Sequence, residues 1–194
     1  MSGLLKLFLA AVLFSAFVSA QPNSSASPKS VASMERKLQH VQSNGATAHP
    51  DPAPTEFTEE EINAYFAAGK VKMPAGVQSV TFQGEPGVVT ATSRVDFDQI
   101  RAGRSSSNPL LSLFSGVHDV VVVAHARGAG GQGLVQVDSV SLDGVEIPRF
   151  ALQLFVEKYL QPKYPNIGLD SRFALPARID TATIGLHRLT VVQK

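Results

Sequence analysis

The feature that most constrains the fold is a pair of strand-like runs, residues 117–126 and 134–142. The first run contains four consecutive valines and is apolar on both faces of a strand. The second run alternates apolar and polar side chains, with Val135 and Val137 on the inner side. The glycines between the runs suit a tight turn, because glycine adopts positive φ angles at little cost. The sequence therefore predicts an antiparallel hairpin within a sheet.

The same glycines also match a nucleotide-binding pattern. Residues 128–133, GAGGQG, fit the motif G-x-G-x-x-G. In a dinucleotide-binding protein this motif opens a helix whose N-terminus faces the pyrophosphate. Here it is followed by LVQVDSVSL, which has the two-residue period of a strand. A hairpin turn is therefore the favoured interpretation, and we expect neither a nucleotide nor another cofactor.

Further segments extend the sheet and place a helix beside it. Residues 77–83 and 88–97 predict two strands around a GEPG turn, and residues 181–193 predict a closing hairpin. Thr58 followed by Glu61 forms a capping-box pattern that begins a helix. Most of these strands alternate in polarity, which is typical of an antiparallel sheet with one covered face.

A second, very apolar helix is predicted to begin at Pro148, because proline suits the first helical position. Arg149, Gln153 and Glu157 form its single polar stripe, and apolar side chains cover most of the rest, so it should be largely buried. The order of elements is not an alternating β-α-β series, which favours an α+β domain. We predict a long curved antiparallel sheet wrapped around this apolar helix, with an additional N-terminal helix.

The first 57 residues differ in composition from the rest of the chain. Residues 1–20 have the layout of a secretory signal peptide, with one charge, an apolar run and small residues at the end. We expect residues 21–57 to be a linker with a short helix over 30–42, and 58–194 to form a single domain. A protein processed in this way would be periplasmic or secreted.

The short helix has two interpretations. Its apolar residues, Val31, Met34, Leu38 and Val41, fall at helical spacing. This pattern predicts either an amphipathic helix that docks on the domain or on a partner, or a weakly helical tether.

Charge and cysteine content exclude several classes of site. Lys6 is one of 17 basic residues, so removal of the leader leaves 16 basic and 16 acidic residues. A nearly neutral protein creates no strong field for nucleic acid, and we expect no nucleic-acid partner. The chain has no cysteine, which excludes disulfides, thiol nucleophiles and cysteine-bound metals.

The histidines predict no catalytic or metal site. His118 and His125 are seven residues apart on one predicted strand, so they should point to opposite faces. His118 and Asp119 are adjacent, and adjacent strand residues also face opposite ways. The chain has neither a zinc-binding H-E-x-x-H motif nor a G-x-S-x-G nucleophile motif. We therefore expect a protein that is not an enzyme, and we keep a hydrolase based on His118 or His125 as a third hypothesis.

The apolar residues exceed what a one-sided sheet and one helix need. One interpretation is a groove between the apolar helix and the sheet that holds a lipid chain. The other is a closed core. The residues expected to line the groove are Ile62, Phe66, Val121, Val123, Phe150, Leu154, Phe155 and Tyr159.

The segment between the second and third predicted strands combines arginines with an apolar cluster. Arg101 and Arg104 could contact lipid headgroups while Leu110, Leu111 and Phe114 enter a bilayer during transient membrane contact. The alternative is a helical plug that caps one end of the core.

Several segments together resemble exported bacterial proteins related to the LmeA-like phospholipid-binding family. The first is FTEEEINAYFAAGKVKMPAGVQSVTFQGEPGVVTATSRVDFD, with an acidic helix cap and a strand that ends in Val-Asp. The second is DSVSLDGVEIPRFALQLFVEKYL, with the spacing Gly144 to Pro148 before an apolar helix. The third is FALPARIDTATIGLHRLTVVQ. The resemblance covers about two thirds of the chain. It implies a fold like that of the tubular lipid-binding proteins, with an apolar cavity, and it transfers no fixed set of binding residues.

Two functions follow as expectations. The first is a soluble exported protein that binds a phospholipid or a similar amphiphile in an apolar groove and takes part in lipid handling in the cell envelope. The second is a non-catalytic structural or interaction module with a filled core, whose partner surface includes the predicted helix over 30–42.

Overall fold

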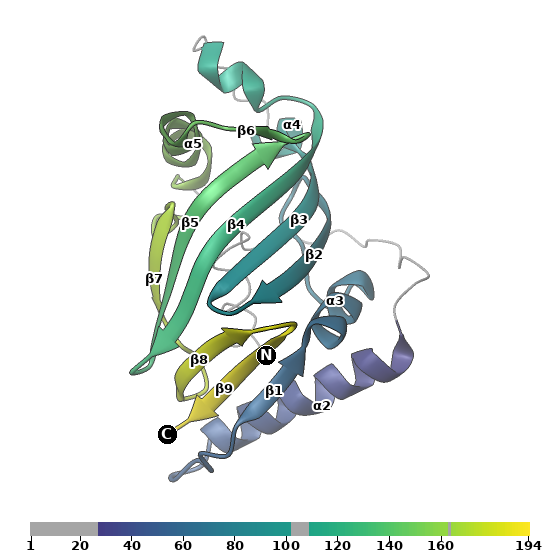
Figure 1. The fold of residues 1–194 in the computed structure, drawn as a ribbon, viewed down its shortest axis with the longest axis vertical. Helices are drawn as coiled ribbons and strands as arrows, with labels where there is room; N and C mark the ends of the chain where they lie inside the picture. Colours follow the sequence, from purple (N-terminus) through teal and green to yellow (C-terminus); the bar gives the residue numbers. More distant parts are fainter. Residues whose placement is uncertain (1–26, 102–108, 163) are drawn as a thin grey trace.

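The protein is an α+β structure built on one large antiparallel sheet (Figure 1). The computed structural model describes residues 27–101, 109–162 and 164–194. The predicted α+β class and antiparallel sheet are confirmed, whereas the predicted signal peptide lies outside the described residues. Within these described residues the nine strands are β1 (Thr55–Thr58), β2 (Val77–Glu85), β3 (Val88–Asp96), β4 (Val117–Ala129), β5 (Gln132–Leu142), β6 (Val145–Glu146), β7 (Asp170–Ala174), β8 (Ile179–Gly185) and β9 (Arg188–Gln193).

The hairpin of β4 and β5 forms the centre of the sheet. Gly130 and Gly131 have φ angles of 57° and 74° and make its two-residue turn, as predicted from the glycine-rich stretch. Gly128 and Gly133 face each other across the hairpin. A Cβ at Gly133 would lie 2.5 Å from the ring of Phe173, so this glycine lets β7 approach closely.

The β2–β3 and β8–β9 hairpins both pair with the edge of β4 that lies opposite β5. The strand order is β1-β9-β8-β4-β3-β2, and β5 pairs with β4, β6 and β7. β3 pairs with β4 up to His125, and β8 takes over at Arg127 and Gly128. The tips of the hairpins meet where Gly87 N donates to Ile184 O at 3.0 Å. Figure 1 accordingly shows the β8–β9 hairpin beyond the tip of the β2–β3 hairpin.

Helix α2 (Pro28–Gly45) is part of the folded unit. It spans the stretch 30–42 that was expected to be helical, and it docks on the domain rather than acting as a tether. Met34 and Val41 are almost completely buried. Gln193 in β9 donates from Nε2 to Val41 O at 2.8 Å. The structure therefore begins the folded unit well before the expected boundary at residue 58.

The remaining helices cover the two ends of the sheet. In helix α3 (Glu59–Ala67) the capping box is formed, because Thr58 Oγ1 accepts from Glu61 N and the Glu61 carboxylate accepts from Thr58 N. Helix α5 (Arg149–Phe155) continues directly into a π-helical turn, η2 (Val156–Leu160). These elements are α3 (Glu59–Ala67), α4 (Phe97–Arg101), the 3-10 helix η1 (Pro109–Leu113), α5 (Arg149–Phe155) and η2 (Val156–Leu160).

The predicted arrangement of the sheet around the apolar helix is not confirmed. Helix α5 lies near one end of the sheet, close to β5 and β6 (Figure 1). It buries Ala151, Leu152 and Phe155, while Phe150 stays 59% exposed. The apolar surface of the sheet is instead divided between α5 at one end and α2 with α3 at the other.

Most of the buried hydrophobic side chains belong to two clusters. We call them the α2-side core and the α5-side core. Val122 of β4 is partly buried and packs against both. The α2-side core contains Met34, Val41, Phe57, Ile62, Tyr65, Phe66, Val71, Val80, Phe82, Ala91, Leu175, Ile179, Ala182, Leu189 and Val191. The α5-side core contains Val95, Phe97, Ile100, Leu111, Phe114, Val120, Val140, Leu142, Ile147, Ala151, Leu152, Phe155, Val156, Tyr159 and Leu169.

Candidate functional site

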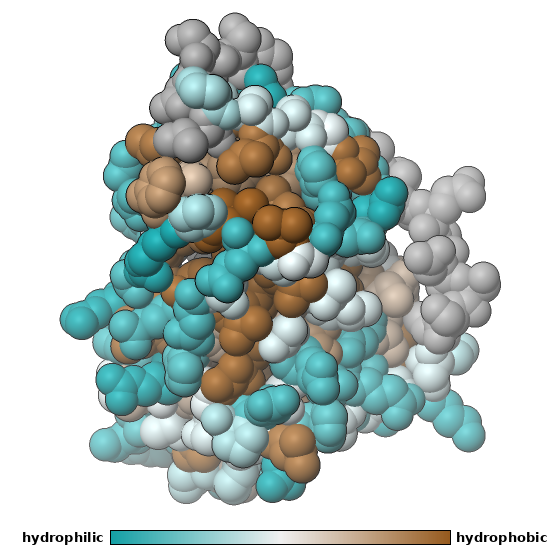
Figure 2. Space-filling model, turned by 45° about the horizontal axis from the view of Figure 1, so that its top comes forward, coloured by the Kyte–Doolittle hydropathy of each residue, from teal (hydrophilic) through white to brown (hydrophobic). Residues whose placement is uncertain are grey.

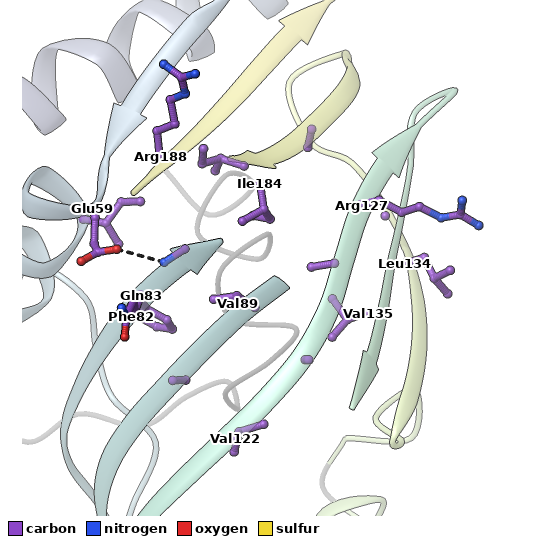
Figure 3. Close-up of a pocket in the computed structure, with 18 of the residues that line it drawn as sticks. Glu59, Phe82, Gln83, Val89, Val122, Arg127, Leu134, Val135, Ile184 and Arg188 are labelled. Carbon is purple, nitrogen blue, oxygen red and sulfur yellow. Dashed lines mark hydrogen bonds between the residues drawn. The ribbon is translucent and has the colours of Figure 1, made fainter. Parts of the chain in front are cut away.

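An apolar pocket lies on the inner face of the sheet, the face that carries both cores. We call it the inner-face pocket. It has a volume of about 100 Å³. Figure 2 shows hydrophobic side chains at the base of a hollow with largely hydrophilic borders. Its apolar side chains are Ile62, Phe82, Val89, Ala91, Val122, Ala124, Ala126, Val135, Phe173, Leu175, Ala182, Ile184 and Leu189 (Figure 3).

Small residues create this hollow. Ala91 in β3, Ala124 and Ala126 in β4 and Ala182 in β8 all line it. Farther along β4, the same face carries Val120, which is buried in the α5-side core. Because alternate residues of a strand share a face, the change from valine to alanine removes volume from one row of the sheet. The pocket is therefore encoded by residue size at inward positions.

The wall near helix α3 is held by one carboxylate. Glu59 Oε2 accepts a hydrogen bond from Gly84 N at 2.9 Å and lies 2.9 Å from His187 Nδ1. Glu59 N also donates to His187 O at 2.9 Å. Helix α3, the β2–β3 tip and the β8–β9 tip are thus fastened together at the pocket wall.

Two arginines lie at the border of the pocket, and the side chains of both point away from its apolar lining (Figure 3). Arg127 and Leu134 point away from the lining, toward the opposite face of the sheet (Figure 3). Arg188 lies at the rim near Glu59 and Ile184, and its guanidinium extends away from the apolar side chains (Figure 3). The interior is therefore almost wholly apolar, and charge is confined to its border.

The structure places the expected groove residues in several environments. Ile62 and Phe66 are both buried in the α2-side core, and Ile62 also lines the inner-face pocket. Val121 and Val123 lie on the opposite face from the pocket, because the lining residues of β4 are Val122, Ala124 and Ala126 and neighbours alternate.

The four expected groove residues of the apolar helix lie apart from the pocket. Phe155 and Tyr159 are buried in the α5-side core, and Leu154 packs against it. Phe150 is exposed. Three of these four side chains therefore pack in or against the α5-side core.

The segment expected to contact a membrane contributes to the core instead. Leu111 and Phe114 are only 3% and 1% exposed, so their burial leaves them unavailable for a bilayer. Arg101 donates from its guanidinium to Phe114 O at 3.3 Å. Leu110 belongs to η1, and Arg104 lies outside the described residues. The described part corresponds to the alternative of a plug that caps one end of the core.

Three of the five histidines, His118, His125 and His187, lie close to carboxylates. His118 Nδ1 lies 2.6 Å from Asp143 Oδ2, and its Nε2 lies 2.7 Å from Ser115 O. The hydrogen bond to Asp143 raises the pKa of His118, since both ring nitrogens face acceptors. Asp119 pairs with Arg94 at 2.9 Å, so an adjacent His118–Asp119 dyad is absent. His125 pairs separately with Asp138 at 2.6 Å.

Neither a metal-binding cluster nor a membrane-spanning helix is found among the described residues. No group of three or more histidine, aspartate or glutamate side chains there could hold a metal ion. None of the described helices has the length and apolar character needed to cross a membrane. No protein-family model, curated protein or solved structure matches this chain.

Proposed function

We propose that the protein binds the apolar chain of a lipid or a similar amphiphile in the inner-face pocket. The observation that carries this proposal is an apolar hollow lined largely by side chains of the α2-side core, with Val122 at its border with the α5-side core. Apolar clefts with few polar groups are the usual form of small-molecule sites. Each methylene group transferred from water would contribute about 0.8 kcal/mol.

The size of the pocket limits what lies inside it. Its volume of about 100 Å³ is smaller than a dry cavity of roughly 150 Å³ that holds benzene. A ligand would therefore place only part of an apolar chain in the pocket and leave the rest along the surface. The polar wall groups of Glu59 and Gly84 already have partners, so apolar contact would dominate binding.

We further propose an exported, non-catalytic role in lipid handling. The expected leader over residues 1–20 and the resemblance to LmeA-like proteins support export and lipid binding as proposals. The occupied ring nitrogens of His118 support a role without catalysis.

The test combines native mass spectrometry with binding of an apolar dye. Purified protein should carry co-purified lipid and should bind diphenylhexatriene, which is uncharged. Ala126→Leu adds bulk inside the pocket and should reduce binding of the dye. Val123→Leu, on the opposite face of the same strand, is the matched control and should bind normally. Bare polypeptide together with no dye uptake would reject the proposal.

A structural or interaction module is the second candidate, and the small pocket volume favours it. Its expected partner surface on α2 needs revision, since the apolar face of that helix packs against the domain. In this case Ala126→Leu and the parent protein should behave alike in every lipid assay, and a partner should bind another surface.

A further inference from the structure

We propose that the inner-face pocket recognises the methyl end of a hydrocarbon chain and discriminates against a chain end that carries oxygen. This inference rests on the proposed function of the pocket. It names the ligand class as amphiphiles whose far chain end is an unsubstituted alkyl group, with the head left outside.

The pocket is closed at both ends along β4. At the hairpin end Leu175 lies over Gly128 and Gly133, because a Cβ at these glycines would lie 2.8 Å and 3.1 Å from its methyl carbons. At the other end Val122 borders the α5-side core, in which Val120 is buried. A chain that enters the hollow from its open side (Figure 2) therefore cannot continue along the strand, so it ends inside.

The backbone groups around the pocket already have hydrogen-bond partners. Asn63 of α3 donates from Nδ2 to Phe82 O at 2.8 Å and accepts from Phe82 N at 2.7 Å, so its amide group pairs with the edge of β2. Where β3 gives way to β8, Ala126 N donates to Gly87 O and Gly87 N donates to Ile184 O, both at 3.0 Å. An oxygen on a bound chain would therefore compete for groups that are already bonded.

The polar side chains around the pocket are also engaged or directed away. The carboxylate of Glu59 already has two partners, and the two arginines at the border point away from the lining (Figure 3). Gln83 alternates with Phe82 along β2, so its side chain lies on the other face. Among the described residues, Tyr159 Oη is the one buried side-chain polar atom without a hydrogen-bond partner, and it lies in the α5-side core.

An oxygenated chain end would thus lose its hydrogen bonds to water without replacing them. Burial of a hydroxyl group without a partner is unfavourable, whereas burial of a methyl group is favourable. A head group is excluded from the pocket for the same reason. An apolar pocket distinguishes a methyl group from a hydroxyl group by up to about a hundredfold in binding.

The experiment compares dodecanoate with 12-hydroxydodecanoate by isothermal titration calorimetry on the full protein. The two ligands share the head and the chain length and differ at the far end. Dodecanoate should bind about tenfold to a hundredfold more tightly. The matched control ligand is 2-hydroxydodecanoate, which carries its hydroxyl group beside the head and should bind nearly as tightly as dodecanoate.

Two valine variants locate the effect in the pocket. Val122→Thr replaces a methyl group of the lining by a hydroxyl group and should narrow the difference between dodecanoate and 12-hydroxydodecanoate. Val123→Thr makes the same change on the opposite face of β4 and should leave that difference unchanged. Thermal unfolding of both variants checks that the fold is retained.

The outcomes separate this inference from the proposed function. Equal binding of dodecanoate and 12-hydroxydodecanoate, or tighter binding of the latter, would overturn the inference while diphenylhexatriene binding upholds the pocket. Equal losses from the two positions of the hydroxyl group, or equal narrowing in the two valine variants, would also overturn it. Failure of diphenylhexatriene and of all three carboxylates to bind would remove the proposed function itself, and this inference with it.

Discussion

The two ends of the inner face and its middle are built from the same strands, yet they differ in how they are covered. At one end β4 carries Val120 beneath the α5-side core, and at the other Val191 of β9 lies beneath α2. Between them Ala124 and Ala126 leave a hollow. Side-chain volume at inward positions, more than strand pairing, therefore decides where this sheet is packed and where it is open.

The two cores are also held by different interactions. The α5-side core is an aromatic cluster in which the Phe114 and Phe155 rings stack at 4.3 Å. The α2-side core adds polar fastenings, including the Lys37–Glu61 ion pair at 2.7 Å and the bonds of Gln193. This contrast predicts that the two ends respond differently to truncation and to pH.

The largest effect should come from the aromatic cluster. Phe114→Ala removes a side chain that is 1% exposed and should lower the free energy of unfolding by about 3–5 kcal/mol. Leu113→Ala is the adjacent control, and with its side chain 45% exposed it should change stability by about 0.5 kcal/mol or less. Urea unfolding measures both. Equal effects would show that the segment does not plug the core.

Truncation of a buried side chain in the α2-side core should lower the free energy of unfolding by a similar or smaller amount. Met34→Ala should lower the free energy of unfolding by about 2–5 kcal/mol, because Met34 is buried between α2 and the domain. Gln39→Ala, on the exposed side of α2, is the control. If Met34→Ala left urea unfolding unchanged, α2 would be a tether rather than part of the core.

The fastening by Glu61 should appear as a pH dependence. Burial raises the pKa of Glu61, but hydrogen bonds from Lys37, Ser33 and Thr58 N outweigh this and lower it below its ordinary value of 4.5. The carboxylate therefore stabilises the fold fully above about pH 4.5, and this is lost as pH falls through the folded-state pKa. Glu61→Gln should be less stable than the parent at pH 7, and the difference should shrink in acid. A constant difference from pH 7 to pH 3 would contradict this.

The smallest effect should come from the exposed pair beside the α5-side core. The hydrogen bond to Asp143 raises the pKa of His118 above 6.5, so its stabilisation is present below pH 6.5 and is lost as pH rises through the raised value. Asp143→Asn should lower the His118 pKa, as measured by NMR titration of the ring. An unchanged titration would show that Asp143 does not raise the pKa of His118.

Much of the sheet was predictable because turns and alternation are local signals. Gly130 and Gly131 fixed the central hairpin, and Thr58 with Glu61 fixed the start of α3. The short strands β1 and β7 were not predicted, since four or five residues carry little periodicity and their pairing is decided by distant partners.

The pocket was harder to predict than the sheet. A run of valines does not reveal which face of a strand is inward. From the sequence we expect Val121 and Val123 to line a groove, whereas Val122, Ala124 and Ala126 on the other face line the pocket. The signal was Ala124 and Ala126 on alternate positions, followed by Gly128. Helix α2 docks through contacts with β9, such as the bond from Gln193 to Val41. A contact between segments so far apart in the sequence cannot be predicted from a local pattern.

The bond from Gln193 to Val41 joins residues 152 positions apart. Contacts so distant in sequence are formed late and slow the folding of a domain, because a long loop must close first. Helix α2 therefore cannot dock on the sheet until β9 has been synthesised and paired. We expect chains that lack β9 to leave the apolar face of this helix undocked.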